Sequence, residues 1–400
     1  MEQNKEGLTL AIVKKRKKRR KRIKVILIIA GIIVALCICA VAAFFILRKV
    51  GENSLKGNVQ NQAKENYITY QGKKYQYKKD MVNILCLGVD IRQENLDEWA
   101  QEDAQAQEEV SQENESESKQ EAIERQKLMG NKTQRRAGQA DAIFLVALDT
   151  KEHTMDVIAV PRDTMVPVKK YSVSGEYEGT QEMQITLQHA YGDGKEQSCE
   201  LMEEAVSNLF YQLPINGYCS INMLALPIVN DAVGGVTVHI DEDLTLLNPE
   251  FTTGSDVLLQ GKAAMDFVGG RDITVAQSSL ARIGRQKEYL MSFVPTAKKA
   301  IKKDITLPVQ LYQTLSQYMV TDISADEVTY LASEGIQCDF SQDNLHIVDV
   351  DVQMGEQYEE YYAKDDELYQ MIIDIFYEEV KFKNLLICKK ENVIVKRNVL

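Results

Sequence analysis

Hydrophobic and polar positions over residues 81–380 alternate at the lengths typical of strands and helices. Apolar runs at 82–89, 142–148 and 155–160 have strand length, and the polar stretch between the last two predicts a hairpin. The later segments change between helical and strand spacing. We expect helices at 199–211, 223–233, 285–303, 307–319, 325–334 and 367–380, and strands at 217–221, 236–240 and 345–350.

Strands that alternate with helices along a chain indicate an α/β fold. We therefore predict a single layered α-β-α domain with a central mixed sheet over residues 81–380. One domain of this length is near the upper size for a single hydrophobic core.

Residues 25–47 contain no charged side chain and are long enough to cross a bilayer as a helix. Lysine and arginine fill residues 14–24, so the tail 1–24 is expected in the cytoplasm and the rest outside. A cleaved signal peptide is the alternative, but it would have a shorter apolar core and a small-residue cleavage site. The sequence favours a single-pass protein of the cell membrane with an extracytoplasmic C-terminal domain.

Three further segments have compositions unlike that of the folded domain. Residues 48–80 are polar and predict an extracytoplasmic stalk with one short hairpin near residue 71. Residues 93–136 are rich in Gln, Glu and Ser, and we expect a disordered acidic insertion there. Residues 381–400 are assigned to a C-terminal tail.

The charge of the chain is divided unevenly along its length. The net charge is −12, while the first fifty residues hold thirteen Lys or Arg and two Glu, a net +11, which leaves about −23 for the remainder. Bulk charge of this sign disfavours nucleic acid as a partner. The basic run before an apolar helix is better explained by membrane topology than by nucleic-acid binding. An anionic ligand would have to be bound by a local arginine cluster.

Several common sites are absent from the sequence. The seven cysteines show no paired spacing, so neither a disulfide framework nor a zinc site is expected. GxSxG, HExxH and Walker motifs are missing as well. His189 is one of four histidines. It could contact a ligand, but the sequence favours a packed side chain.

Charged residues gather where predicted strands end. Asp90 and Arg92 follow the first strand, although an ordinary turn would also account for them. Asp141 begins one hairpin strand and Arg162 follows the other, so their side chains should be neighbours; Asp163 comes next. Asp90 and Asp141 would hold Mg²⁺ through carboxylate oxygens, and the arginines would bind phosphate. A structural salt bridge is the competing interpretation.

A second arginine group lies further along the chain. Arg282 and Arg285 are three positions apart on a predicted helix, and Arg271 precedes them. Residues at this spacing share a helix face, so both guanidinium groups would reach one ligand. Surface arginines of helices are also common without any ligand.

In this order, the motifs resemble those of the LytR-CpsA-Psr family of cell-wall glycopolymer transferases. The similarity covers about residues 80–330, with a weaker helical continuation to about 380. The matching segments are 83–90, Asp141, 158–164, 189–192, 229–236, 259–264 and 281–286.

The resemblance implies an activity and roles for the site residues. Family members move a glycopolymer, such as teichoic acid or capsule, from a polyprenyl pyrophosphate carrier to peptidoglycan on the outer membrane face. We expect the source to be a Gram-positive bacterium. The lipid tail lies in an apolar tunnel of the domain. By this resemblance Asp90 and Asp141 bind Mg²⁺, Asp163 orients its neighbours, and the pyrophosphate is bound by Arg92, Arg162, Arg271, Arg282 and Arg285. A carboxylate near the metal could also take the proton of the incoming hydroxyl, so Asp141 is assigned that role, and Asp141 and Arg162 are the predicted catalytic residues.

Two positions depart from the family pattern. Gln139 and Gly269 stand where the family has arginines, so two charges of the expected phosphate site are missing. Arg135 and Arg136 are candidate replacements. A scaffold or regulator that binds polyprenyl phosphate or wall glycan without catalysis, and a polyprenyl pyrophosphatase, therefore remain alternatives to the transferase.

Overall fold

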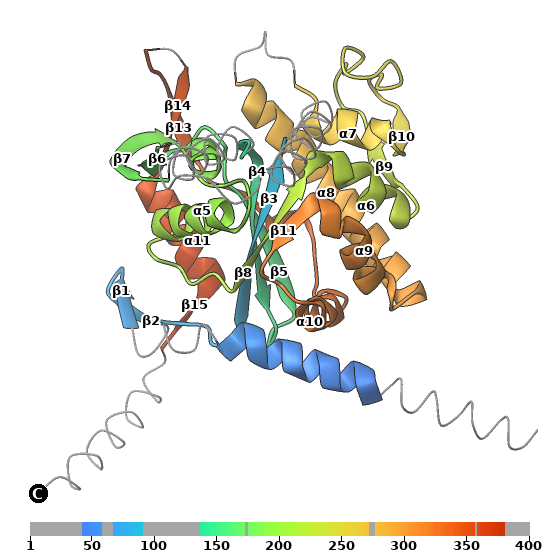
Figure 1. Cartoon of the computed structure of the whole chain (residues 1–400), viewed down its shortest axis with the longest axis horizontal. Helices are drawn as coiled ribbons and strands as arrows, with labels where there is room; N and C mark the ends of the chain where they lie inside the picture. Colours follow the sequence, from blue (N-terminus) through green and yellow to red (C-terminus); the bar gives the residue numbers. More distant parts are fainter. Residues whose placement is uncertain are drawn as a thin grey trace, which may run out of the picture.

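A six-stranded sheet forms the centre of the molecule (Figure 1). The computed structural model describes residues 42–57, 67–90, 137–172, 175–271, 277–356 and 358–380. In the order of the sheet, the strands are β11 (Met319–Thr321), β8 (Gly217–Asn222), β3 (Met81–Val89), β4 (Ala140–Asp149), β5 (Thr154–Ala159) and β12 (Leu345–Ile347).

The sheet is mixed, as predicted. Strand β4 is antiparallel to both β3 and β5, which confirms the predicted hairpin, and β11 is antiparallel to β8. The pairs β3–β8 and β5–β12 are parallel. This arrangement confirms the predicted α/β class with a central mixed sheet.

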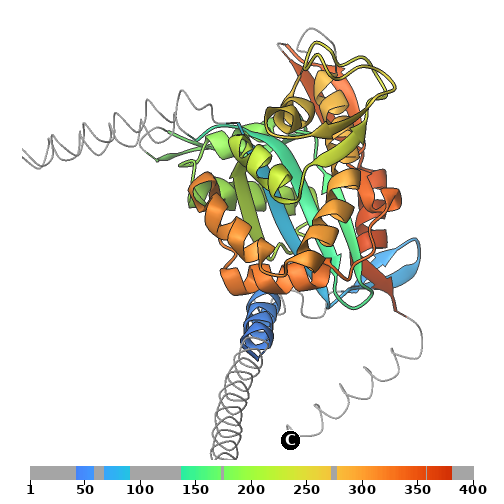
Figure 2. The same cartoon turned by 90° about the vertical axis from the view of Figure 1, so that its right-hand side faces the viewer.

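Alternate residues of β3 enter two hydrophobic clusters, as the two-residue period of a strand requires. Leu85 and Leu87 face helices α5 (Glu196–Leu209) and α11 (Asp365–Phe376) on one side of the sheet. On the other side, Val82 and Ile84 pack with the cluster that includes Tyr330 of α10 (Ala325–Gly335) and Leu55. Figure 2 shows helices on both faces, so the layered α-β-α architecture is present.

A smaller unit packs beside the sheet around its own hydrophobic cluster. It begins with helix α6 (Leu226–Ala232), which ends at Gly234 and Gly235 with φ of 99° and 84°, as the glycine pair predicted. The other elements are β9 (Val236–His239), β10 (Asp256–Leu259), α7 (Lys262–Gly269) and α8 (Ser278–Lys303). Helix α9 (Leu307–Leu315) follows α8 and packs against α10. Helix α8 begins seven residues before the predicted start at 285, because polar Ser278 and Ser279 hide the periodicity there.

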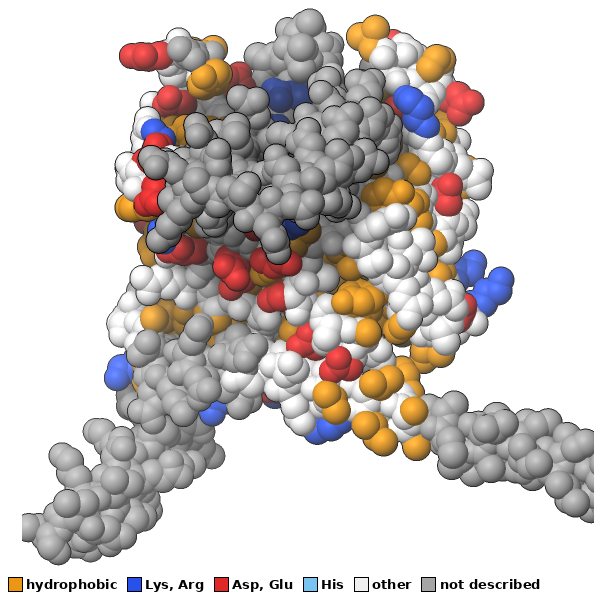
Figure 3. Space-filling model, viewed as in Figure 1, with side chains coloured by type: hydrophobic (Ala, Val, Ile, Leu, Met, Phe, Trp, Pro, Cys, Tyr) orange, Lys and Arg blue, Asp and Glu red, His pale blue; other side chains and the backbone are white. Residues whose placement is uncertain are grey.

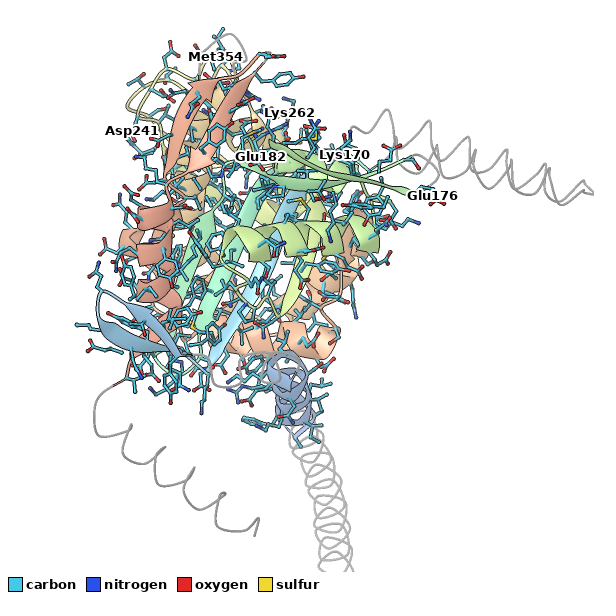
Figure 4. The ribbon with its side chains drawn as sticks, turned by 90° about the vertical axis from the view of Figure 1, so that its left-hand side faces the viewer. Lys170, Glu176, Glu182, Asp241, Lys262 and Met354 are labelled. Atoms are coloured by element: carbon cyan, nitrogen blue, oxygen red, sulfur yellow. The ribbon has the colours of Figure 1, made fainter. Side chains whose placement is uncertain are left out.

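Two antiparallel ribbons were not predicted from the sequence. They are β6 (Met165–Tyr171) with β7 (Tyr177–Gln184), and β13 (Val350–Met354) with β14 (Glu359–Ala363). Both extend beyond the upper end of the sheet, with Glu176 and Met354 near their tips (Figure 4). Most of their residues are exposed or half-buried, so they lack the apolar runs that mark core strands.

Residues 48–57 and 67–80, the described parts of the predicted stalk, pack against the folded domain. Residues 42–57 are helical, and Arg48 of this helix forms an ion pair with Glu334 of α10. The expected hairpin is present as β1 (Tyr67–Tyr70) and β2 (Lys73–Tyr77), but β2 also pairs with the final strand β15 (Tyr377–Glu379). Contacts with distant residues thus bind the described parts of 48–80 to the rest of the domain.

Some predictions lie outside the described residues, namely most of the span at 25–47, the insertion, the tail, and Arg92, Arg135 and Arg136. Within the described ranges, no helix has the length and hydrophobicity needed to cross a membrane. The four cysteines in these ranges, Cys86, Cys199, Cys219 and Cys338, are all free.

Candidate functional site

A cavity of about 440 Å³ opens where β3 ends and β4 begins. Its wall combines carboxylate, guanidinium and apolar side chains from segments far apart in the sequence. The residues that carry this mixture are Asp90, Asp141, Met223, Met265, Asp266, Gly269 and Arg282. The predicted meeting of Asp90 and Asp141 at one end of the sheet is thus present in the structure.

Asp141 lies in a β-bulge. Gly88 pairs with Ala142, while Val89 pairs with Ala140, so Asp141 is the extra residue between two pairs of the ladder. A bulge turns a side chain away from its regular direction, and bulges are frequent beside active sites. Here Ala140 and Ala142 are both buried, and Asp141 between them is directed into the cavity wall.

Two arginines bind the two oxygens of the Asp141 carboxylate. Arg162 Nη1 donates to Oδ1, and Arg282 Nη1 donates to Oδ2 at 3.2 Å. Arg282 Nη2 also donates to the Asp141 carbonyl oxygen at 3.0 Å. The predicted Asp141–Arg162 pairing is therefore confirmed, and a third residue, 141 positions from Asp141, completes the cluster.

The neighbours of Arg162 hold its guanidinium in place. Gln139 Oε1 accepts a hydrogen bond from Arg162 Nη2. Asp163 Oδ1 lies 3.6 Å from Arg162 Nε, a contact consistent with the orienting role predicted for it. Position 139 is one of the two departures from the family pattern, because an arginine is expected there. In this chain Gln139 instead helps to position Arg162.

Burial gives this cluster its electrostatic character. The Arg282 side chain is 5% exposed, and burial lowers its pKa, an effect that the Asp141 carboxylate opposes and nearby Arg162 and Arg271 reinforce. The Nε atoms of Arg162 and Arg282 are buried and have no hydrogen-bond acceptor within the described part of the chain. Buried donors without partners are unfavourable, so an anionic ligand with several oxygens would stabilise this arrangement.

Arg271 and Arg285 occupy different positions relative to the cluster. Arg271 is close enough to affect the Arg282 pKa, and its Nε donates to Ser278 Oγ at 2.8 Å. Arg285 donates from Nε to the Phe267 carbonyl oxygen at 3.1 Å and from Nη2 to that of Gly270. These bonds attach the end of α7 to α8.

Arg282 and Arg285, predicted to bind one ligand, line different cavities in this structure. Arg285 lines a separate cavity of about 550 Å³ together with Glu242 and Glu288. The reason is that residues three apart on a helix differ in direction by about 60°. The end of α7, which Arg285 contacts through Phe267 and Gly270, lies beside both cavities.

The carboxylates fit the expected Mg²⁺. This ion is usually bound by one or two carboxylates together with water and phosphate oxygens, rather than by a full protein cage. Asp90 and Asp141 supply such a pair on one cavity wall. The described residues hold no group of three or more His, Cys, Asp or Glu that would bind a metal without a phosphate ligand.

Other motif residues have structural roles. Asn230 Nδ2 donates to the Leu259 carbonyl oxygen at 2.8 Å, and Tyr289 donates to Asn230 Oδ1. His189 is buried, its Nδ1 lies 3.1 Å from the Gly138 carbonyl oxygen, and burial lowers its pKa. The packed interpretation of His189 is therefore supported by the structure.

Sequence reasoning missed the apolar and acidic wall formed by Met223, Met265 and Asp266. A Cβ atom on Gly88 would lie 2.8 Å from Met223 Sδ, so glycine at the end of β3 allows Met223 to reach the cavity. Gly88, two residues before Asp90, is the signal for this wall that the sequence contains.

Comparison with known proteins identifies relatives of this chain. A teichoic acid transferase TagU of Bacillus cereus, described as polyisoprenyl-teichoic acid–peptidoglycan teichoic acid transferase, is 23% identical over 210 residues, 52% of this chain and 63% of the relative. The corresponding protein of Bacillus mycoides is 27% identical over 157 residues, 39% of this chain and 46% of the relative. The chain thus spans less than two thirds of these relatives.

Solved structures share the fold. The structure described as TagT bound to LI-WTA has a TM-score of 0.50 at 18% identity and covers 74% of this chain and 90% of its own. The protein gbs0355 of Streptococcus agalactiae has a TM-score of 0.51 at 16% identity and covers 74% of this chain and 86% of its own. The model of the LytR_cpsA_psr family matches residues 47–375, and the chain belongs to this family.

Proposed function

We propose that this protein is a membrane-anchored phosphotransferase that moves a glycopolymer from a polyprenyl pyrophosphate carrier to peptidoglycan on the outer membrane face. The observation that carries the proposal is the Asp141 carboxylate held between the guanidinium groups of Arg162 and Arg282 at a cavity. The relatives described as teichoic acid transferases agree with it. Teichoic acid and capsule polymers are both candidate substrates.

The guanidinium groups would act by exchanging partners. Without a ligand, the Asp141 carboxylate balances the charge of Arg162 and Arg282. Pyrophosphate oxygens have the geometry to take over these charge-assisted hydrogen bonds. Donor binding would therefore release the Asp141 carboxylate from the two arginines, so that it can bind Mg²⁺ and accept a proton. Arg162 and Arg282 would neutralise the phosphates, with Arg271 beside them and Arg92 as a further candidate.

Transfer follows from this exchange. The acceptor hydroxyl oxygen forms a bond to the phosphorus that carries the glycopolymer, the bond from that phosphorus to the bridging oxygen breaks, and polyprenyl phosphate leaves. Asp141 takes the hydroxyl proton. Arg162 and Arg282 stabilise charge on the phosphate oxygens in the transition state. Mg²⁺, held by Asp90 and Asp141, would supply additional positive charge to the same oxygens when bound.

The carrier lipid needs an apolar path from the bilayer. The cavity lies at one end of β3, and the helix at 42–57 lies near the other, so the nine residues of β3 separate them by roughly 30 Å. On one face of β3, Val82, Ile84 and Cys86 are apolar over part of this distance, where they pack with Leu55 and Tyr330. The tunnel for the polyprenyl chain stays a proposal.

The decisive test uses the full chain in proteoliposomes with a radiolabelled saccharide on polyprenyl pyrophosphate, peptidoglycan oligosaccharides and Mg²⁺. We expect label to appear on peptidoglycan through a phosphodiester, and to stop doing so when EDTA removes the metal. Release of labelled saccharide phosphate to water alone would identify a pyrophosphatase. Donor binding without any turnover would identify the scaffold, and both outcomes would overturn the transferase.

A further inference from the structure

A third cavity lies at the opposite end of the molecule from the arginine cluster. It has a volume of about 620 Å³ and is enclosed by the helix at 42–57, the end of α8, α9 and α10. Its lining is almost entirely apolar and includes Phe44, Leu47, Ile301, Ile305, Val309 and Ile336. We call it the basal groove.

The helix at 42–57, which forms one side of the basal groove, is bound to the rest of the domain. Arg48 forms its ion pair with Glu334 and donates from Nε to Ser333 Oγ at 2.9 Å. A Cβ atom on Gly51 would lie 2.3 Å from the Asp326 carbonyl oxygen, so only glycine allows this close contact of the helix with α10. These contacts attach the helix at 42–57 to α10 beside the groove.

Large apolar side chains around the basal groove face outward. Phe45, Ile46 and Ile305 are 59%, 63% and 59% exposed. Figure 3 shows hydrophobic side chains gathered at the lower corner, where the helix at 42–57 meets the elements of the groove. Contiguous exposed apolar surface of this kind marks an interaction site, because covering it with an apolar partner is favourable.

Position and charge identify the partner. The groove begins at Ala43, inside the uncharged run 25–47, so it lies where a helix crossing a bilayer would leave the hydrocarbon. The exposed lysines of α8 next to it, Lys299, Lys302 and Lys303, are positive in a chain whose net charge is −12. Cations beside an apolar face match an anionic lipid surface.

We propose that the basal groove is a second membrane contact, filled by acyl chains of anionic phospholipids in the outer leaflet, with the α8 lysines at the level of the headgroups. This contact fixes the tilt of the domain on the bilayer. The proposal rests on the membrane anchor of the proposed function but not on its transferase activity.

Bromine quenching of tryptophan fluorescence tests the contact. The single tryptophan, Trp99, is replaced by Phe in the full chain, and Ile305→Trp is introduced as the probe. The matched control is Leu246→Trp, because Leu246 is 87% exposed and lies in the unit around β9 and β10, outside the groove. Both variants are reconstituted at one chain per vesicle in phosphatidylglycerol vesicles, with or without bromine on the acyl chains.

Fluorescence from position 305 should fall about twofold in brominated vesicles, since interfacial side chains insert ~5–10 Å into the headgroup and acyl boundary. Fluorescence from position 246 should not change. Lys302→Glu with Lys303→Glu should weaken the quenching at 305. Equal signals at 305 and 246 would overturn the proposal. Quenching that needs added polyprenyl phosphate would make the groove a carrier entrance instead, and quenching seen only at high protein density would indicate a second copy.

Discussion

Arg282 donates to Asp141 from both of its terminal nitrogens, to the carboxylate at 3.2 Å and to the main-chain carbonyl oxygen at 3.0 Å. The pair therefore joins helix α8 to the first residues of β4, and it fixes the side chain and the backbone of the bulged residue together. Because Arg282 is buried, this contact contributes to folding as well as to the site.

Removing the carboxylate should unfold the site unless an acceptor remains. We expect Asp141→Ala to lower the free energy of unfolding by about 3–5 kcal/mol, the usual cost of leaving a buried ion without its partner. Asp141→Asn keeps an oxygen for one arginine and should cost less, while both variants lose transfer. Thermal melting of the full chain in detergent measures the difference. Equal melting midpoints for Asp141→Ala and the parent chain would show that the Asp141 carboxylate does not stabilise the fold.

An arginine at position 269 should strengthen donor binding. Gly269 lines the cavity, and a Cβ atom there would meet only Met223 Cε, at 3.7 Å, so a side chain fits. Charge-assisted hydrogen bonds contribute about 1.5–3 kcal/mol, so Gly269→Arg should lower the Kd for polyprenyl pyrophosphate by ~10-fold or more. Leu246→Arg adds the same charge outside the cavity and serves as the control. Equal gains in both variants would mean that net charge alone is responsible.

Arg285 and Arg282 should respond differently to the same substitution. Arg285→Met removes two hydrogen bonds to the end of α7 and should cost about 1–3 kcal/mol of stability, with donor affinity nearly kept. Arg282→Met should abolish donor binding. Calorimetric titration with polyprenyl pyrophosphate, alongside melting curves, separates the two. A large loss of affinity in Arg285→Met at unchanged stability would restore the phosphate role that the family resemblance implies.

The sheet was predictable because its strands have a strong signal. Strands β3, β4 and β5 are apolar almost throughout, since both faces of the sheet are covered, and continuous apolar runs identify such strands. The ribbons β6–β7 and β13–β14 alternate only weakly and project from the core, so periodicity could not reveal them. The predicted helix at 25–47 continues to residue 57, and this continuation was missed for a different reason. Arg48 and Lys56 look solvated until their partners in distant segments are known.

The site was predictable in part. Asp141 and Arg162 meet because a hairpin brings its two ends together, which is a local property of the chain. Arg282 reaches them only through the packing of α8, and the direction of Arg285 depends on the end of α7. The exchange of an arginine for Gln139 looked like a lost charge, but its contact with Arg162 appears only in three dimensions.

A carboxyl group away from the site should make stability depend on pH. Burial raises the pKa of Glu203, on α5, to about 7, and the charges of Asp322 and Glu200 contribute in the same direction. The ordinary value of 4.5 applies in the unfolded chain. The folded state therefore binds the proton more tightly, and its stability is greatest below pH 4.5 with respect to this group and is lost as the pH rises through 7.

Glu203→Gln removes this dependence, because glutamine stays neutral. At pH 8 the variant should be more stable than the parent chain by about 1–2 kcal/mol, after allowance for solvent screening of a half-buried group, and at pH 4 the two should be equal. Glu204→Gln is the matched control, since Glu204 is exposed and its Oε1 lies 2.6 Å from Lys169 Nζ, so its loss should not stabilise the chain at any pH. Denaturant titrations at both pH values measure these differences. A Glu203→Gln chain that is no more stable than its parent at pH 8 would mean that solvent reaches Glu203 and that its pKa is ordinary.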